Sequence, residues 1–445
     1  MAKGLGSAEK ARRLVLSLFF RAVLGIERIF HFETLDDVGF ALLTGGQEVL
    51  ARTTLGGLVR AVTTRATQAF ARATERLGGL RDRVVTLSLD EHAIARFTRK
   101  FRIPKGFHTI RNKWMRIEKL FFLYWPAQRR FVQLLVTRGN AALADMALAF
   151  LRAVRARTHP RQIRLILDAA ATKTNASLRR FDRCRKTVFL LRAPRRPAYL
   201  KAWKRLPRET FQCVDEPGRY VGAKPKRIEI TETTTPMAGL ARPMRTIVVR
   251  EHASRGKDRW HALFILHDDT TAPLDLLHEF RTRQHHEQGY RIGVHDIALD
   301  TVPSGYSKDG SPDRPGFRQG PLLLCGWIDA LAWDALREFG DALPAAFHLA
   351  HPRTLRRWGL VRDAELLVTP SHLLVVLESA HHRAWLRPLM QAFNDAKVSL
   401  PWFGGRRVAI GFAASCPPLN DARPVPPDLP EAGSDFAGFA RGVWC

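Results

Sequence analysis

The stretch 271–290, which reads TAPLDLLHEFRTRQHHEQGY, predicts a helix that carries an acid on one face. Four side chains recur at offsets of four, three and four residues and therefore share that face: Leu276, Phe280, Arg283 and Glu287. A Glu beside an Arg on a packed helix is in most proteins a structural ion pair, and this alternative stays open until other acids are considered.

Two further acids follow strand-like runs. Asp90 ends RVVTLSLD and Asp168 ends RQIRLILD, so a mixed sheet with a helix packed on it would bring both acids close to Glu287. Hard divalent ions prefer carboxylate oxygens, and two ions roughly 3.5 to 4 Å apart activate the attacking and leaving oxygens of phosphodiester chemistry. We therefore expect a site for two Mg²⁺ ions, with Mn²⁺ as a substitute, in which Asp90 bridges the ions and Asp168 and Glu287 each bind one. Arg283 would hold a phosphate or orient a carboxylate.

The composition points to a polyanionic partner. The 445 residues include 71 Lys and Arg against 42 Asp and Glu, which gives a formal net charge of +29 and a pI of about 11.0. Basic residues are spread through every region and do not gather on one amphipathic segment, which favours nucleic acid over a membrane surface. A generally basic proteome is the alternative explanation of this charge.

The sequence excludes several other classes of function. It contains no GxxxxGK[ST] loop for a nucleoside triphosphate and no GxSxG elbow, and its five Cys form no CxxC pair. A zinc site or a disulfide framework is therefore not expected. The apolar run 14–26 is too short to span a bilayer and is not followed by a signal-peptide cleavage pattern, so we expect a cytoplasmic protein without a membrane partner.

Residues 95–118 mix aromatic and basic side chains in a pattern typical of a surface that grips a DNA backbone. Phe97, Phe101, Phe107 and Trp114 are interleaved with eight basic residues against one acid. A solvated face is the usual meaning of a charge run, but this run directly follows the first candidate ligand. The basic residues are Arg96, Arg99, Lys100, Arg102, Lys105, Arg111, Lys113 and Arg116, of which the first seven are our predicted DNA-binding residues.

Changes in periodicity and composition divide the chain into six expected segments. They are a helical DNA-binding region at 1–78, the first part of an α/β core at 79–178, a β-strand insertion at 179–269, the second part of the core with the helix of Glu287 at 270–320, an α/β module at 321–415 and a Pro-rich tail at 416–445, with the stretch 415–435 expected to be poorly ordered. The first segment is of helix-turn-helix type or a generic helical bundle. The core begins with a strand, a two-strand hairpin around PAQ, a helix and a strand. The α/β module serves packing, dimerisation or contact with DNA ends.

These features together resemble the DDE transposases of bacterial insertion sequences. The relevant class has the signature Tyr, two residues, Arg, three residues, Glu, six residues, Lys, with a β-strand insertion before the Glu helix. Phe280, Arg283 and Glu287 match this spacing, with Phe in place of Tyr. The Lys position falls on Val294, which departs from the pattern, and Arg291 is the candidate substitute.

The resemblance covers residues 34–300 in organisation and implies a ribonuclease H-like mixed five-stranded sheet, whose first and fourth strands bring their acids together. It implies a Mg²⁺-dependent endonuclease that cuts the ends of a mobile element and joins their 3′-OH ends to double-stranded target DNA. It also implies a homodimer or larger oligomer on DNA, associated with a bacterial nucleoid.

In relatives that form hairpinned ends, an aromatic residue of the insertion stacks on an unpaired base, which makes Trp260 a candidate; a core position is the alternative. His286, beside Glu287, is expected on a solvated helix face, with DNA contact as the alternative. Two rival functions stay open: a ribonuclease H-like nuclease without strand transfer, and a domesticated DNA-binding protein without catalysis.

Overall fold

The computed structural model of the chain consists of two units, one formed by Thr74–Tyr290 and the other by Met1–Ala73 with Arg291–Cys445. The structure describes residues 6–74, 77–81, 83–97, 103–108, 110–216, 226–252, 257–301, 319–348, 350–378, 384–413 and 438–444. No helix in these ranges is both long and apolar enough to cross a membrane.

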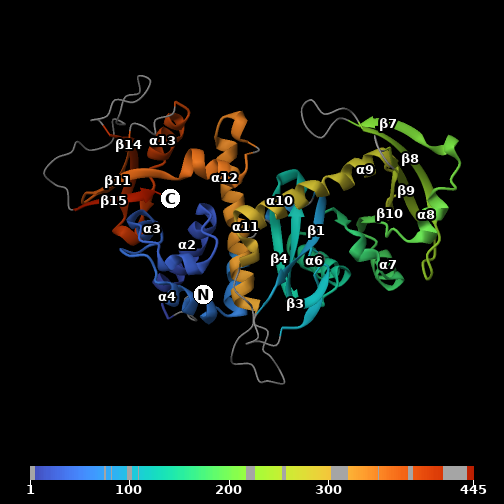
Figure 1. Ribbon diagram of the computed structural model, residues 1–445, viewed down its shortest axis with the longest axis horizontal. Coiled ribbons are helices and arrows are strands. Elements are labelled where there is room, and N and C mark those ends of the chain that lie inside the picture. The colour runs from blue at the N-terminus through green and yellow to red at the C-terminus, as the bar shows by residue number, and fades with distance from the viewer. Residues whose placement is uncertain are drawn as a thin grey trace. The chain divides into compact units, whose positions relative to one another are not determined.

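The unit Thr74–Tyr290 is built on one sheet flanked by helices (Figure 1). Its strands are β1 (Val84–Ala95), β2 (Lys105–His108), β3 (Lys113–Trp125), β4 (Arg130–Arg138), β5 (Gln162–Leu167), β6 (Thr187–Arg192), β7 (Gln212–Glu216), β8 (Lys226–Thr235), β9 (Met244–Glu251) and β10 (Arg259–Leu266). Its α-helices are α6 (Leu143–Thr158), α7 (Asn175–Asp182), α8 (Pro197–Trp203), α9 (Pro273–Arg281) and the start of α10 (Arg283–Asp296). Short 3₁₀ turns lie at Leu77–Leu80, Pro126–Gln128, Ala169–Thr172 and Arg208–Thr210.

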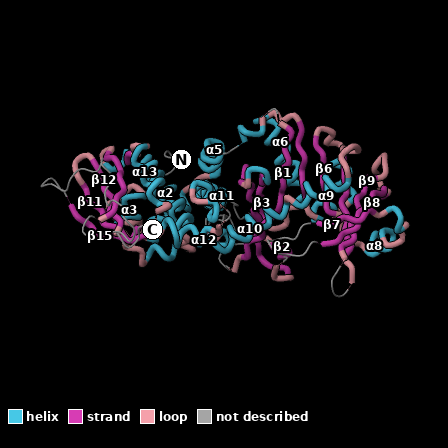
Figure 2. The backbone as a smooth tube through the Cα atoms, turned by 90° about the horizontal axis from the view of Figure 1, so that it is seen from above, coloured by secondary structure: helices cyan, strands magenta, loops and turns pink. Residues whose placement is uncertain are grey.

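The sheet has ten strands in the order β2-β3-β1-β5-β6-β10-β9-β8-β7, with β4 paired to β3. β1 runs parallel to β5, and β5 runs parallel to β6, whereas β3 and β4 are antiparallel to their neighbours. In Figure 2 the strands of this sheet are the magenta tubes that include β1, β3, β6, β8 and β9. The pairing of β1 with β5 ends at the opposed residues Leu89 and Leu167. Asp90 and Asp168 are the next residues of the two strands' chain segments and therefore lie side by side at this end of the pairing.

Two apolar cores cover the two faces of this sheet. One face packs against α6, α7 and α8, where side chains such as Leu87, Phe150 and Phe189 are almost fully buried. The other face packs against α9, where Leu276, Leu277 and Phe280 form a second cluster with strand residues. The helix with the predicted stripe therefore has a packed apolar side, as its spacing predicted.

Several expectations for this unit are confirmed and others are wrong. The hairpin around PAQ is β3 and β4, and the helix that follows it is α6. β6 was expected in the insertion, but it pairs in parallel with β5. The sheet has ten strands where five were expected, because the insertion strand β10 pairs with β6 and extends the same sheet.

The other unit combines the N-terminal helices with the C-terminal part of the chain. Its helices are α2 (Ala8–Leu24), α3 (Val38–Leu43), α4 (Arg52–Ala61), α5 (Thr64–Thr74), α11 (Gln319–Ala342), α12 (Pro352–Leu355) and α13 (Leu386–Asp395), with 3₁₀ turns at Ile29–Glu33, Leu299–Thr301, Ala345–Phe347 and Pro401–Phe403 and a π-helix at Arg356–Leu360. Its strands are β11 (Arg362–Val368), β12 (His372–Leu377), β13 (Ser399–Leu400), β14 (Arg406–Phe412) and β15 (Gly438–Trp444), in the order β13-β14-β12-β11-β15.

The helical character expected for the N-terminal region and for α11 is confirmed. A buried ion pair joins the two segments, because Arg21 of α2 contacts Asp329 of α11 at 2.5 Å. The last residues of the expected tail segment are a strand, since β15 pairs with β11 along seven residue pairs. The Pro-rich part of the tail lies outside the described residues.

Candidate active site

One face of β1 is polar although a helix covers it. Thr86, Ser88 and Asp90 stand at every second position of the strand and therefore point to the same side. Asp90 was expected at the end of its strand, but β1 continues to Ala95 because it stays paired with β3 beyond the last contact with β5. The sequence TLSLD thus buries its leucines on one face and presents a hydroxyl, a hydroxyl and a carboxylate on the other.

The predicted stripe lies on two consecutive helices. α9 ends at Arg281, and Thr282 caps it by donating from Oγ1 to the carbonyl of Glu279 at 2.7 Å. α10 begins at Arg283 and continues to Asp296, so the loop expected from residue 291 starts later. Figure 1 shows α9 and α10 as neighbouring yellow ribbons. A single continuous helix was therefore the wrong expectation, because the side chain of Thr282 competes for the backbone at the junction.

Each of the three polar residues on this face of β1 meets a polar residue of these helices. Thr86 donates from Oγ1 to Oε1 of Glu279 at 2.6 Å, and Asp90 Oδ2 accepts from Nη2 of Arg283 at 3.1 Å. Between them, Ser88 Oγ lies 3.0 Å from Nδ1 of His286. Alternate residues of β1 thus face side chains that point to one side of α9 and α10. These three contacts fix the position of the two helices along the strand.

Arg283 contacts all three predicted ligands. Its Nη2 lies 3.1 Å from Oδ2 of Asp90 and 3.8 Å from Oδ2 of Asp168, and its Nη1 lies 2.6 Å from Oε1 of Glu287. The Arg283 side chain is 9% exposed and that of Asp90 is 19% exposed, whereas Asp168 is 35% and Glu287 is 52% exposed. The four side chains therefore form a cluster with a buried floor and a rim that solvent reaches.

The charges of this cluster depend on one another. Burial raises the pKa of Asp90 to about 6, although the nearby guanidinium of Arg283 opposes that rise. Burial alone would lower the pKa of Arg283, but the carboxylates of Asp90, Asp168 and Glu287 outweigh burial and raise it. Arg283 is thus held as a cation.

The buried partner of Ser88 is a neutral imidazole. His286 is fully buried, and its ring stacks on Tyr124 with a centroid distance of 4.9 Å and an interplanar angle of 13°. Burial, helped by the charge of Arg283, lowers the pKa of His286 well below its ordinary value. The expectation that His286 lies on a solvated face is wrong, because α10 turns this side chain onto the polar face of β1.

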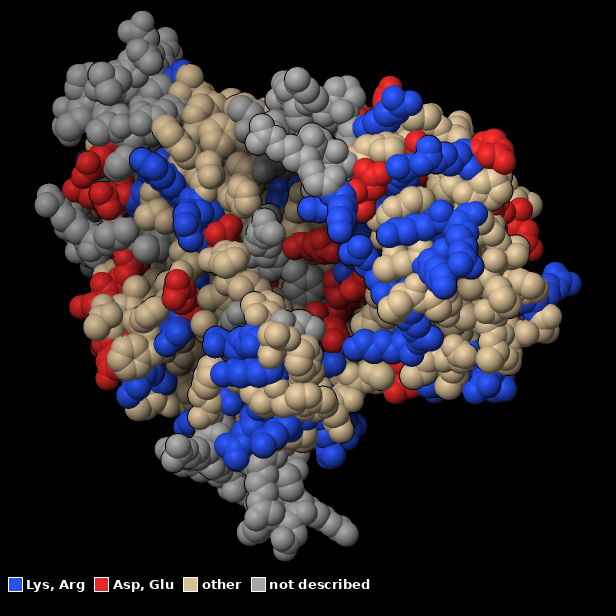
Figure 3. Space-filling model, turned by 45° about the vertical axis from the view of Figure 1, so that its right-hand side comes forward, with Lys and Arg blue, Asp and Glu red and all other residues tan. Residues whose placement is uncertain are grey.

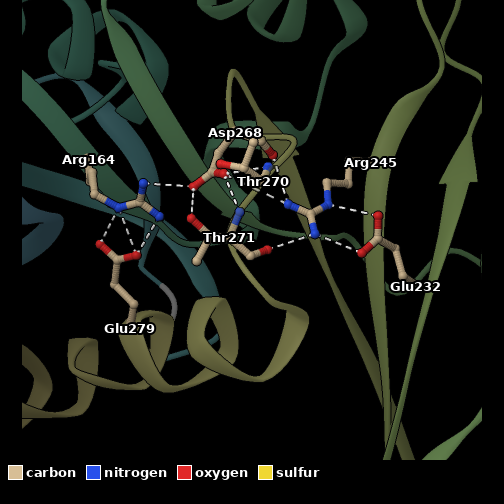
Figure 4. Close-up of polar contacts among 7 residues, drawn as sticks. All are labelled: Arg164, Glu232, Arg245, Asp268, Thr270, Thr271 and Glu279. Atoms are coloured by element: carbon tan, nitrogen blue, oxygen red, sulfur yellow. Dashed lines mark hydrogen bonds and ion pairs between the residues drawn. The ribbon is translucent and has the colours of Figure 1, made fainter.

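A second network anchors α9 to the sheet (Figure 4). Arg164 of β5 donates from Nε to both carboxylate oxygens of Glu279, at 2.7 and 2.8 Å, and from Nη1 to Oδ2 of Asp268 at 2.7 Å. Asp268 also accepts from the backbone N–H and the hydroxyl of Thr271, just before α9. These contacts fix the start and the end of α9 and so position Arg283, which follows it.

The same network reaches into the insertion strands. Arg245 of β9 donates from Nε and Nη2 to the two carboxylate oxygens of Glu232 on β8, at 2.9 and 2.7 Å. The Arg245 guanidinium also donates to the backbone carbonyls of Asp268 and Thr271. Arg245 therefore links the insertion strands β8 and β9 to the segment just before α9, as Figure 4 shows.

The predicted DNA-binding residues fall into three groups. Lys105, Arg111 and Lys113 are exposed on or beside the hairpin of β2 and β3. Arg96 instead forms an ion pair with the buried carboxylate of Glu118 at 2.6 Å. Its positive charge is therefore partly neutralised by this carboxylate. Arg99, Lys100 and Arg102 lie outside the described residues, as does the side chain of Arg291.

Trp260 lies at the start of β10 and is partly buried. Its ring meets that of Phe211 edge to face at 6.0 Å, and the guanidinium of Arg250 lies 5.5 Å from the centroid of its ring. It also packs against the apolar core on the face of the sheet that α6, α7 and α8 cover. These contacts within the protein agree with a core position for Trp260, which was the alternative to stacking on a base.

The donor set of the carboxylate cluster fits a divalent cation. Among the residues that the structure describes, no three His, Cys, Asp or Glu side chains are already grouped closely enough to hold a metal ion, and Arg283 lies among the three carboxylates. Three carboxylates against one guanidinium nevertheless leave an excess of two negative charges. Oxygen ligands with this charge suit Mg²⁺ or Mn²⁺.

Basic side chains are numerous on the face of the molecule that Figure 3 shows. It carries Lys and Arg in several separate groups and Asp and Glu in smaller ones. The whole chain has a formal net charge of +29. Such a surface attracts a polyanion over a wide area.

Sequence reasoning placed the three acids and Arg283 but missed the residues that hold them. Ser88 and Glu279 had a signal in the sequence, because both lie at the same period as Asp90 and Arg283. The role of Arg164 had none, since a single Arg in a strand gives no indication of the two carboxylates that it bridges.

No family model matches the chain, and no curated protein matches it. Among solved structures, a cryo-EM structure of the piggyBac transposase synaptic complex with hairpin DNA matches with a TM-score of 0.39 and 10% sequence identity. The match covers 74% of this chain and 66% of that chain, slightly less than two thirds of its length. A TM-score of this size does not establish a shared fold or function.

Proposed function

We propose that the chain is a Mg²⁺-dependent DNA transposase of the DDE type, which cuts DNA at the ends of a mobile element and joins the 3′-OH ends to target DNA. One observation carries this proposal: Asp90, Asp168 and Glu287 meet around Arg283, although they come from two neighbouring strands and from a helix that follows the β-insertion. This combination matches the ordered set of residues that the sequence suggested.

The strand order supports a ribonuclease H-like core for this enzyme. Within the larger sheet, the five strands β4-β3-β1-β5-β6 are adjacent in this order. β4, β3 and β1 pair antiparallel, and β1, β5 and β6 pair parallel. Asp90 and Asp168 directly follow the last paired residues of β1 and β5. The insertion strands β7 to β10 come between this core and α9.

The residues of the site divide into ligands and positioning groups. Asp90, Asp168 and Glu287 would hold the metal ions, which would neutralise phosphate charge and activate the attacking oxygen. Arg283 orients the three carboxylates, and its buried, permanently charged guanidinium keeps them together when no other cation is bound. Neutral His286 holds α10 against Ser88 and so maintains the distance between Glu287 and the strands.

DNA is the partner that suits the charge of +29 and the exposed Lys105, Arg111 and Lys113. The phosphates of both element ends and target would be contacted, in a dimer or larger assembly that brings two ends together. We propose a nucleoid-associated protein for the same reason.

The proposal is tested with DNA that carries the inverted repeats flanking the gene, labelled at the 3′ ends, in the presence of Mg²⁺. We expect the wild type to cut these ends and join them to a second DNA, and we expect Glu287→Gln to do neither. Glu91→Gln is the matched control, because Glu91 neighbours Asp90 on β1 but pairs with Lys119 at 2.9 Å. Absence of both reactions in the wild type, with DNA bound, would overturn the proposal.

A ribonuclease H-like nuclease without strand transfer is the second candidate, favoured by the same carboxylates. Supplying DNA ends that already carry a free 3′-OH separates the two functions. A transposase joins such ends to target DNA, whereas a simple nuclease cuts uncleaved DNA but leaves precleaved ends unjoined.

A further inference from the structure

The hairpin of β2 and β3 presents one face that combines aromatic and basic side chains. Phe107 is paired with Trp114, and two positions away Lys105 is paired with Arg116. Directly opposed residues of antiparallel strands point to the same side, so these four side chains share one face. We call this the aromatic–basic face.

The aromatic–basic face is exposed to solvent. Trp114 is 70% and Phe107 is 42% exposed, and their rings lie 6.2 Å apart. Beside them, Phe97 is 70% and Ile110 is 82% exposed. Among the described residues eight large hydrophobic side chains are exposed, and four of the eight belong to this region. Exposed apolar side chains that gather in one place mark an interaction site.

The opposite side of the hairpin is packed, so the face is held in place. Gly106 is buried, and a Cβ atom there would lie 2.5 Å from the carbonyl oxygen of Gly139, so only Gly fits against the neighbouring chain. His108 is 5% exposed and its Nδ1 accepts from the backbone N–H of Arg111 at 3.3 Å. A ligand would meet aromatic rings that are already positioned, which lowers the entropy cost of binding.

The charge of this region has one sign. Residues 93–117 contain no Asp or Glu, and the nearest acid, Glu118, is fully buried and paired with Arg96. Arg111 stacks on the ring of Phe97 with its guanidinium 5.2 Å from the centroid. A protein partner would favour an apolar centre with few charges, whereas rings alternating with cations suit a strand of stacked bases and phosphates.

We propose that the aromatic–basic face binds single-stranded nucleic acid, with unpaired bases stacked on Trp114 and Phe107 and phosphates held by Lys105 and Arg116. This inference rests on the proposed function in taking DNA as the partner, and it assigns a separate site for strands whose bases are unpaired. Stacking makes the site tolerant of sequence, because every base has a ring face.

The test compares Trp114→Ala and Trp114→Phe with the wild type by fluorescence anisotropy. The probes are an oligothymidine, an abasic strand of the same length and a duplex. We expect Trp114→Ala to weaken binding of the oligothymidine about tenfold, within the range for one stacked base, and to leave the abasic strand unaffected. Trp114→Phe should keep most of the affinity. Trp358→Ala, which removes a ring that is 41% exposed in the other unit, is the matched control.

A basic variant separates the two kinds of contact. Lys105→Gln should weaken the oligothymidine and the abasic strand equally and reduce the salt slope by about 0.7, the value for one phosphate of a single strand. The inference is wrong if Trp114→Ala binds the oligothymidine as the wild type does, or if it loses the abasic strand to the same extent. Phe107→Ala provides the same comparison if Trp114→Ala melts below the control.

Failure of this inference and failure of the proposed function give different results. A wild type that binds, cuts and joins duplex ends while Trp114→Ala keeps its full affinity for oligothymidine removes only the single-strand site. A wild type that binds oligothymidine through Trp114 but never cuts duplex DNA removes only the transposase.

Discussion

Arg283 donates from Nη2 to Oδ2 of Asp90 at 3.1 Å, across 193 positions of the chain. The contact joins the first residue of α10 to the middle of β1, and the same guanidinium reaches Asp168 and Glu287. Three like charges that would repel one another are thus held around a permanent cation. The guanidinium of Arg283 supplies the counter-charge around which the three carboxylates gather.

Replacing Arg283 by Met should therefore destabilise the protein and increase its response to metal. Asp90 would lose its buried counter-charge, at a cost of about 3 kcal/mol and a fall of several degrees in melting temperature. We expect Mg²⁺ to raise the melting temperature of Arg283→Met more than that of the wild type, because the ion then supplies the missing charge. Melting curves with and without Mg²⁺ measure both effects, and an equal metal shift in the two proteins would contradict the role given to Arg283.

The contact of His286 with Ser88 should be visible in a double-mutant cycle. His286→Phe keeps a ring against Tyr124 but leaves the buried hydroxyl of Ser88 without this partner, at a cost of about 1 to 3 kcal/mol. Adding Ser88→Ala removes the stranded hydroxyl and should recover part of the loss. Urea unfolding measures the coupling, and additive effects of the two changes would show that the hydrogen bond contributes nothing.

Asp268 should make the stability of the protein depend on pH in the acid range. Burial alone would raise the pKa of Asp268, but hydrogen bonds from Thr271 and Arg164 outweigh burial and hold the pKa below its ordinary value. Because the folded pKa is lowered, this stability is present above the unfolded pKa of about 3.9 and is lost as pH falls through the folded value. Asp268→Asn should thus be less stable than the wild type at pH 7 by about 1 to 3 kcal/mol.

The difference between Asp268→Asn and the wild type should shrink as pH falls below about 4. Asp269→Asn is the matched control, because Asp269 is exposed beside it. Urea unfolding at several pH values measures the difference, and a gap that stays constant down to the acid limit would show that Asp268 is not a charged acceptor in the folded protein.

The sequence predicted the three acids because each follows a recognisable period. Strand-like runs were recognised before Asp90 and Asp168, and helical spacing placed Arg283 and Glu287 on one face. That the two strands are neighbours was implied only by the family resemblance. The break at Thr282 could not be predicted, because a Thr inside a helical pattern is tolerated unless its hydroxyl finds a backbone carbonyl nearby.

Long-range pairing explains the remaining errors. The sequence placed β6 in the insertion because its residues follow Asp168 and precede the other insertion strands. Its parallel pairing with β5, which has no local signal in the sequence, makes it part of the parallel region of the sheet. His286 looked solvated, because the helix on which it lies is polar on most sides and only the polar face of β1 provides a buried partner. The extension of the sheet to ten strands likewise depends on the pairing of β10 with β6, which has no local signal.

DNA binding should depend steeply on salt. The affinity for duplex DNA is expected to fall with a log–log slope of about −0.9 for each phosphate contacted, as counterions are released. Lys113→Gln should weaken binding to all sequences alike and reduce that slope by about 1. Binding curves at several salt concentrations provide the slope, and a flat response in the wild type would remove DNA as the partner.

The most direct test of the central claim is the rate of Mg²⁺-dependent DNA cleavage by Asp90→Ala, Asp168→Ala and Glu287→Ala, measured beside Glu91→Gln and the wild type. We predict that each of the three variants loses cleavage almost completely, that Glu91→Gln cuts at nearly the wild-type rate, and that removing Mg²⁺ with a chelator stops the wild type until Mg²⁺ or Mn²⁺ is restored. Cleavage by Asp90→Ala at the wild-type rate would contradict the assignment of this cluster as the active site.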